Sequence, residues 1–192
     1  FPGARGFGFV RRVPVAQQQA FLDQARRDGK PDFAIRQLSP HPGERFVIQY
    51  IEALAGNQAA IGLDIASEDN RREAALAAMR SGEARLTRPI TLVQAAGKPL
   101  QSFLILLPIY RDAQTPASPQ ERELQLFGWS YAPLLTEEVL QGLELDSERL
   151  HLRLHDITDS GRHEAFYESR SASEAAPEIM CHSLQRDIYG RR

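Results

Sequence analysis

Cysteine, lysine and long apolar runs are all scarce in this sequence. Cys181 is the only cysteine, which excludes a disulfide within the chain but leaves the compartment open. The longest apolar stretch, residues 103–110, has the length of a strand and falls far short of the roughly 18–20 residues of a membrane helix. We therefore expect no membrane span here, and we expect any anchoring segment to lie outside these residues.

An excess of charge of one sign is also missing. The chain has 192 residues, with 23 basic and 25 acidic side chains, and its net charge is −2. Nucleic acids and anionic membranes are bound by concentrated basic surfaces, so neither partner is expected. With 42% hydrophobic and 25% charged residues, the composition is that of a globular protein, long enough for one large domain or two small ones.

Recognisable catalytic and metal-binding motifs are absent as well. The sequence has no phosphate-binding loop and no nucleophile elbow of the Gly-x-Ser-x-Gly type. Cys181 and His182 are adjacent, and sequence neighbours rarely face each other as a nucleophile and its base do. His151 and His155 would lie about 13 Å apart on one strand, too far to share a metal ion. We predict that the chain is not an enzyme and uses no cofactor.

The order of the expected elements predicts an α+β fold with an antiparallel sheet. Periodicity and end signals predict helices over residues 14–27, 68–80 and 136–141, with Ser67 as the cap of the second. Strands are predicted at residues 33–38, 45–54, 84–91, 92–94, 103–110, 124–131, 148–157 and 165–168. Residues 6–13 form a strand or a loop, and residues 111–122 form a loop. Because regular βαβ alternation is missing, a PAS-like fold is the natural candidate: a five- or six-stranded sheet with helices over one face.

Asp64 stands out on physical grounds because it lies within an apolar run, residues 61–66. A carboxylate that is buried with such a run must be satisfied by hydrogen-bond donors. Two interpretations follow. The side chain caps the helix that starts three or four residues later, or it accepts hydrogen bonds from the N–H groups of a ligand.

Several segments together resemble a known family. They are residues 57–67, 71–76, 90–94 and 103–110. The first has an asparagine, then a glycine, a hydrophobic residue and Asp64; the second has paired arginines followed by alanines. The last two look like strands, and the second of them ends in Pro108, a hydrophobic residue and Tyr110. In this order and spacing the segments resemble the CHASE family of extracytoplasmic sensor domains.

This resemblance implies an architecture and a cellular role. Family members form the outward-facing input of sensor histidine kinases, diguanylate cyclases and plant cytokinin receptors, between two membrane helices. The fold expected from it is a long N-terminal helix followed by two PAS-like modules, and we expect the long helix to lie outside these residues. We expect a membrane-distal ligand-sensing module at residues 1–131 and a smaller, membrane-proximal module at residues 132–192.

The resemblance also implies a ligand site. In the plant receptors the aspartate that matches Asp64 binds the edge of an adenine-derived hormone, and the backbone that matches Leu86 also contacts the base. Leu106 stands where those receptors have a threonine, which makes a pocket here narrower and drier. A planar or apolar small molecule is therefore expected in place of the hormone itself.

These expectations combine into a pocket between the sheet and the segments that cover it. The predicted ligand-binding residues are Asp64, Leu86, Leu106, Phe103, Tyr50 and Tyr131, with Ile48 and Ile105 on the same sheet. Binding of a small molecule would shift the arrangement of a homodimeric parent receptor in the inner membrane and switch a cytoplasmic kinase or cyclase. The alternative is a protein-interaction or dimerisation module without a small-molecule ligand.

Overall fold

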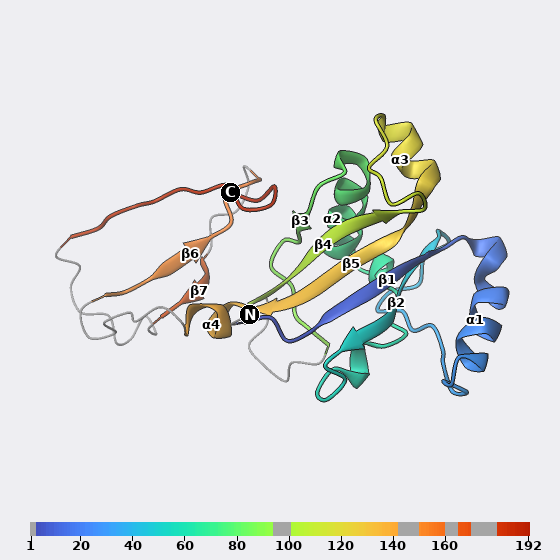
Figure 1. The fold of residues 1–192 in the computed structure, drawn as a ribbon. Helices are drawn as coiled ribbons and strands as arrows, with labels where there is room; N and C mark the ends of the chain where they lie inside the picture. Colours follow the sequence, from blue (N-terminus) through green and yellow to red (C-terminus); the bar gives the residue numbers. More distant parts are fainter. Residues whose placement is uncertain (1–2, 94–100, 142–149, 160–164, 170–179) are drawn as a thin grey trace.

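The computed structural model describes residues 3–93, 101–141, 150–159, 165–169 and 180–192. Figure 1 shows a twisted sheet with its helices on one side and beyond its ends, together with a smaller hairpin region that holds the C-terminus. Among the described residues, no helix is long and apolar enough to cross a membrane.

An antiparallel sheet of five strands dominates the fold. The strands are β1 (Phe7–Val13), β2 (Arg45–Glu52), β3 (Arg85–Leu86), β4 (Ser102–Tyr110) and β5 (Leu126–Leu135). Their order in the sheet is β2-β1-β5-β4-β3, and every neighbouring pair is antiparallel. The predicted α+β class with an antiparallel sheet is therefore confirmed, and residues 7–13 are a strand. Of the predicted strand 84–91, only Arg85 and Leu86 form a strand, β3, and Ile90 adds an isolated antiparallel bridge to Ser102 of β4.

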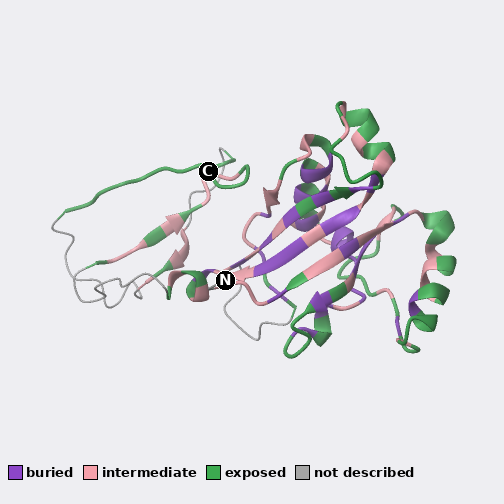
Figure 2. Cartoon of the chain, in the orientation of Figure 1, coloured by how far each residue is buried: buried purple, intermediate pink, exposed green. Residues whose placement is uncertain are grey.

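The main core lies between this sheet and helix α2 (Asp69–Ser81). Alternate residues of β4, among them Leu104, Leu106 and Tyr110, are buried on the α2 side because side chains alternate between the faces of a strand. Two hydrogen bonds fix the packing. Trp129 Nε1 donates to the carbonyl of Ala75 over 2.9 Å, and the Tyr110 hydroxyl donates to the carbonyl of Met79 over 2.8 Å. Figure 2 shows the buried residues gathered along the central strands.

The start of α2 differs from the prediction in its cap. Glu68 is the N-cap, and its carboxylate accepts the N–H groups of Asn70 and Arg71. Ser67 was predicted for this role and lies one residue too early. Its hydroxyl instead accepts the N–H of Leu38 over 2.9 Å and donates to the Asp64 carbonyl over 2.5 Å. At the other end Gly82 takes the left-handed conformation that ends many helices.

The helix predicted over residues 14–27 begins with the 3-10 turn η1 (Val15–Gln17) and continues as α1 (Gln18–Arg27). A second, smaller core forms under α1. Its buried members are Val13, Ala25, Phe33 and Val47. The strand predicted over residues 33–38 is wrong, since only Arg36 makes a bridge, to Leu63. This segment belongs to the connection between α1 and β2, and it contributes Phe33 to the smaller core.

The loop predicted over residues 111–122 ends in a helix, α3 (Pro119–Gln125). Ser118 accepts the N–H of Glu121 while the Glu121 carboxylate accepts the N–H of Ser118, and Pro119 occupies the first turn. This capping box is present in the sequence pattern but was not predicted. Because α3 extends to Gln125, β5 begins at Leu126, two residues later than predicted.

The C-terminal part contains α4 (Thr136–Leu140), as predicted, and a two-stranded hairpin of β6 (Arg153–His155) and β7 (Ala165–Glu168). The pairing of β6 with β7 agrees with the predicted strands, although β6 is shorter than residues 148–157, of which 148 and 149 lie outside the described residues. In the predicted strand 92–94, Leu92 and Val93 are not in a strand, and residue 94 is outside the described part. The division at residue 131 and the second PAS-like module stay predictions.

Candidate functional site

Asp64 lies at the junction of β2 with the 3-10 turn η3 (Ile65–Ser67) and is fully buried. Its Oδ1 accepts the backbone N–H groups of Phe46, over 2.8 Å, and Ala66, over 3.1 Å. Its Oδ2 lies 2.8 Å from His41 Nε2 and 3.3 Å from Gln37 Nε2. The carboxylate therefore caps η3, and the cost of burying it is offset by donors from four residues.

His41 is held against Asp64 by the turn in which it lies. Arg45 Nη1 donates to the carbonyls of His41 and Gly43, over 2.7 and 2.8 Å, so the guanidinium closes the turn. Arg45 Nε is also 3.8 Å from Asp64 Oδ2. The His41 side chain is only 11% exposed, and it lies between the buried carboxylate and the outside.

A groove of about 370 Å³ opens directly over this cluster. Its walls include Phe46 and Ala66, whose amides bind Asp64, and His41 itself. The remaining lining residues are Arg12, Pro42, Gly43, Glu44, Arg72, Leu76, Met79 and Glu123. The groove thus has an apolar floor against α2 and a rim that carries both signs of charge.

Ion pairs hold the rim in place. Arg12 makes a two-pronged contact with Glu44, at 2.5 and 3.0 Å, and also donates to the carbonyl of Glu123. On the opposite side Arg72 Nη2 pairs with Asp69 over 2.7 Å. The Arg72 side chain is 42% exposed and lines the groove, so it is accessible to a molecule in the groove.

Two other predicted site residues, Leu106 and Tyr131, are brought together in the core. They face each other across β4 and β5, and both are buried. The Tyr131 hydroxyl has no hydrogen-bond partner among the residues that the structure describes. Burial raises the pKa of Tyr131 well above its usual value, so this hydroxyl stays protonated.

The remaining predicted residues lie elsewhere. Tyr50 is 46% exposed on the sheet face away from α2, where it is the cross-strand partner of Phe9. Lys30 Nζ lies 4.6 Å from the centre of the Tyr50 ring. Phe103 contacts Phe166 edge to face, with 5.1 Å between ring centres. The N–H of Leu86 is already engaged, because it donates to the carbonyl of Tyr189 over 3.0 Å.

No pattern in the sequence indicated the partners of Asp64. No site role was predicted for His41, Arg12 or Gln37. These residues reach Asp64 or the groove through contacts between segments far apart in the chain. A histidine in a turn just before a strand was the one available signal. Within the described ranges, no group of three metal-ligating side chains is found.

Comparison with known proteins identifies the family. No curated protein matches the chain. The family model for the CHASE domain matches residues 1–167, which includes the sheet, α2, the Asp64 cluster and the groove. The chain therefore belongs to the CHASE family and is an extracytoplasmic sensor input domain of a signalling receptor, not a catalytic domain.

Proposed function

We propose that this domain binds a small molecule in the groove over Asp64 and His41, and that binding controls a kinase or cyclase on the far side of the membrane. The observation that supports this most strongly is the position of His41. Its ring lines the groove and also binds a fully buried carboxylate. A ligand that contacts His41 therefore acts on the junction of β2, η3 and α2.

The groove has the size and chemistry of a small-molecule site. Its volume of about 370 Å³ falls in the lower part of the usual range for ligand pockets. Phe46, Leu76 and Met79 offer apolar contact, while Arg72 offers donors. These features suit a compact organic molecule with an apolar body and an acceptor or carboxylate at one end.

One of the sequence-predicted residues enters this proposal with a defined role. Asp64 positions His41 and the amides of the groove wall. Tyr131 and Leu106 are not among the residues that line the groove. Signalling follows if the ligand has unequal affinity for two arrangements of a homodimeric receptor.

A specific observation favours a second candidate, a protein-interaction module. On the sheet face away from α2, Phe9 and Phe127 stack with 5.5 Å between ring centres, and Arg11 lies 3.5 Å from the centre of the Phe127 ring. Arg11 Nη1 is buried without a hydrogen-bond partner in the described part of the chain. Burial, and then the charge of nearby Arg111, lower the pKa of Arg11. A partner with an apolar surface and a carboxylate would complete this face.

A thermal-shift screen against small organic acids, amino acids, purines and cytokinins tests the first candidate. A ligand at about 100 times its dissociation constant adds roughly 2.7 kcal/mol of stability. Leu76→Trp fills the groove, and Ala77→Trp, on the exposed side of the same helix, is its control. The groove site predicts a shift that Leu76→Trp abolishes and Ala77→Trp preserves.

Loss of output in the full receptor separates the two candidates. Leu107 is 49% exposed on the sheet face that carries Phe127, away from the groove. If a protein partner binds this face, Leu107→Glu abolishes receptor output while Leu76→Trp does not. If the groove is the input, the two variants have the opposite effects.

A further inference from the structure

The last residues of the chain form a tight turn against the edge of the main sheet. Ile188 and Arg191 exchange two backbone hydrogen bonds, of 2.7 and 3.0 Å. Tyr189 and Gly190 between them have φ values of 48° and 80°. The Tyr189 carbonyl accepts the N–H of Leu86, so the turn covers the outer side of β3. We call residues 188–192 the terminal turn.

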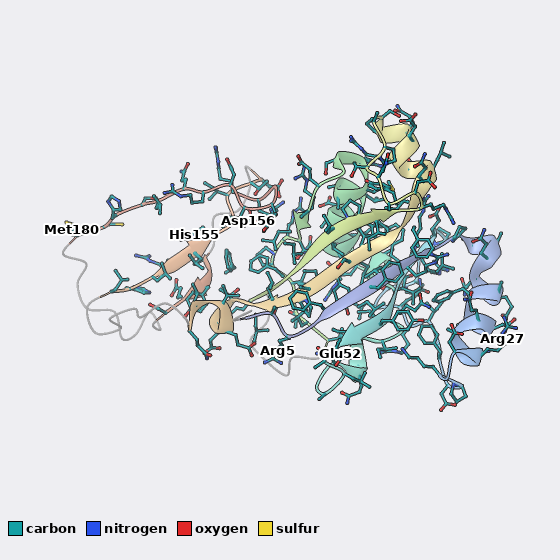
Figure 3. The ribbon with its side chains drawn as sticks, in the orientation of Figure 1. Arg5, Arg27, Glu52, His155, Asp156 and Met180 are labelled. Atoms are coloured by element: carbon teal, nitrogen blue, oxygen red, sulfur yellow. The ribbon has the colours of Figure 1, made fainter. Side chains whose placement is uncertain are left out.

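Arg191 anchors this turn in a second place. Its Nε donates to Asp156 Oδ2 over 2.9 Å, and its Nη2 contacts both Asp156 and, over 3.3 Å, Asp159. The Arg191 and Asp156 side chains are only 17% and 13% exposed. Figure 3 shows Asp156 just after β6, beside the C-terminal segment. A partly buried pair with two donors to one carboxylate is stronger than a surface ion pair.

Backbone hydrogen bonds reinforce the anchor. The N–H of Ile157 donates to the carbonyl of Arg192 over 2.7 Å, and the N–H of Arg192 donates to Thr158 Oγ1 over 2.8 Å. Residues 156–159 therefore hold the terminal turn through both side chains and backbone. The turn is joined on one side to the hairpin region and on the other to the main sheet.

A short chain of ion pairs connects this anchor to the groove. Asp159 also accepts from Arg88 Nε, over 2.9 Å, and Arg88 Nη2 lies 3.3 Å from Glu73 Oε2 on α2. Helix α2 supplies Arg72, Leu76 and Met79 to the groove. Arg88 thus lies between the helix that forms the groove wall and the residues that hold the terminal turn.

We propose that the terminal turn is a latch on the edge strand β3, locked by Arg191 and connected to the groove helix α2 through Asp159, Arg88 and Glu73. Strand β3 has only two paired residues, so its outer edge depends on the Tyr189 carbonyl for its hydrogen bond. In the closed latch the Tyr189 carbonyl binds the Leu86 N–H, and in the open latch this hydrogen bond is broken. Movement of α2 changes the Arg88 contacts and so shifts the balance between the two states. This sensory consequence rests on the proposed function, whereas the latch itself does not.

Hydrogen exchange of two neighbouring amides tests the latch without any ligand. The N–H of Leu86 points to the latch, whereas the N–H of Thr87 donates to the Leu104 carbonyl within the sheet, over 3.0 Å. Arg191→Gln should raise exchange at Leu86 about ten-fold or more, as the loss of a charge-assisted contact implies, and leave Thr87 unchanged. An equal rise at both amides, or no rise at Leu86, would overturn the proposal.

Two further variants control for charge and for the turn. Arg192→Gln removes the same charge from an exposed pair with Asp187 and should leave Leu86 exchange as in the wild type. Gly190→Ala changes no charge, but alanine rarely adopts the φ of 80° that Gly190 has in this turn. The added Cβ would also lie 2.9 Å from Arg85 Cδ, so the substitution disfavours the turn. It should raise Leu86 exchange as Arg191→Gln does. If Arg192→Gln matches Arg191→Gln instead, net charge and not the latch controls this edge.

A double-mutant cycle tests the connection to α2. If Arg88 and Arg191 act through the shared carboxylate of Asp159, the rise in Leu86 exchange in the double variant Arg88→Gln/Arg191→Gln is smaller than the product of the two single rises. A multiplicative result means that Arg88 is not part of the latch. Because no ligand is present, this outcome is independent of whether the groove binds one.

Discussion

His41 Nε2 lies 2.8 Å from Oδ2 of the fully buried Asp64 and at the same time lines the groove above it. This pair joins the surface of the domain to its core at a point where β2, η3 and α2 meet. A buried carboxylate is tolerated only with a full set of donors, so anything that changes His41 changes the balance that holds Asp64 in place.

Replacement of Asp64 should be severe. Asp64→Ala leaves the N–H groups of Phe46 and Ala66 without an acceptor and removes the partner of His41. We expect a loss of about 3–5 kcal/mol in the free energy of unfolding, measured by urea denaturation. Asp69→Ala, in an 84% exposed side chain, should change it by less than about 1 kcal/mol. Equal stability of the two variants would contradict the structural role of Asp64.

Replacement of Tyr131 by phenylalanine should raise the stability of the domain, in contrast to replacement of Asp64. Because its hydroxyl is buried without a partner, Tyr131→Phe should stabilise the ligand-free domain by about 1 kcal/mol. Burial raises the pKa of Tyr131 in the folded state, so the wild type should lose stability as pH rises above about 10, where the unfolded chain ionises first. The variant should lose less over that range. Thermal unfolding at neutral and alkaline pH measures both effects, and a destabilised Tyr131→Phe would show that the hydroxyl has a partner.

Gly62 and Gly56 form a matched pair for backbone strain. Their φ values are 81° and 78°, but a Cβ on Gly62 would lie 2.2 Å from the Ala34 carbonyl oxygen, whereas one on Gly56 meets nothing within 4 Å. Gly56→Ala should cost about 1 kcal/mol of stability through its positive φ. Gly62→Ala should cost about 2 kcal/mol more, because the connection through Ala34 must move. Equal losses in chemical denaturation would mean that this connection yields freely.

The paired arginines of α2 should behave differently. Arg71 is 3% exposed and bridges Glu68, over 3.0 Å, and the carbonyl of Thr91, over 2.7 Å. Burial lowers the pKa of Arg71, although Glu68 opposes the shift. Arg71→Gln should cost about 3 kcal/mol and Arg72→Gln less than about 1 kcal/mol. The same denaturation experiment separates them, and a larger effect at Arg72 would contradict this arrangement.

Strong periodicity in the sequence predicted the main elements correctly. The helix at residues 68–80 and the strands at residues 45–54 and 103–110 have apolar patterns that only one type of element can bury. The strand at residues 33–38 failed because alternation over six residues does not provide a neighbouring strand with which to pair. Helix α3 was missed because its polar composition hid a capping signal at Ser118 and Glu121.

The candidate site was predictable only in part. An aspartate in an apolar run indicated that Asp64 needs hydrogen-bond donors if it is buried, and the structure shows it fully buried with such donors. Its donors could not be inferred, because His41 lies 23 residues earlier in the chain, in a turn that Arg45 closes. The groove is formed by β1, the turn at residues 41–44, β2, η3, α2 and α3 together, and no local pattern contains that arrangement.

A titration of the domain with each compound from the screen, followed through backbone amide chemical shifts, tests whether a small molecule binds in the groove over Asp64 and His41. We expect a saturable shift of the Phe46 and Ala66 amides, which bind Asp64, together with the His41 ring, and loss of these shifts in Leu76→Trp. Saturable shifts that leave these three groups unchanged, or no saturable shift with any compound, would contradict it.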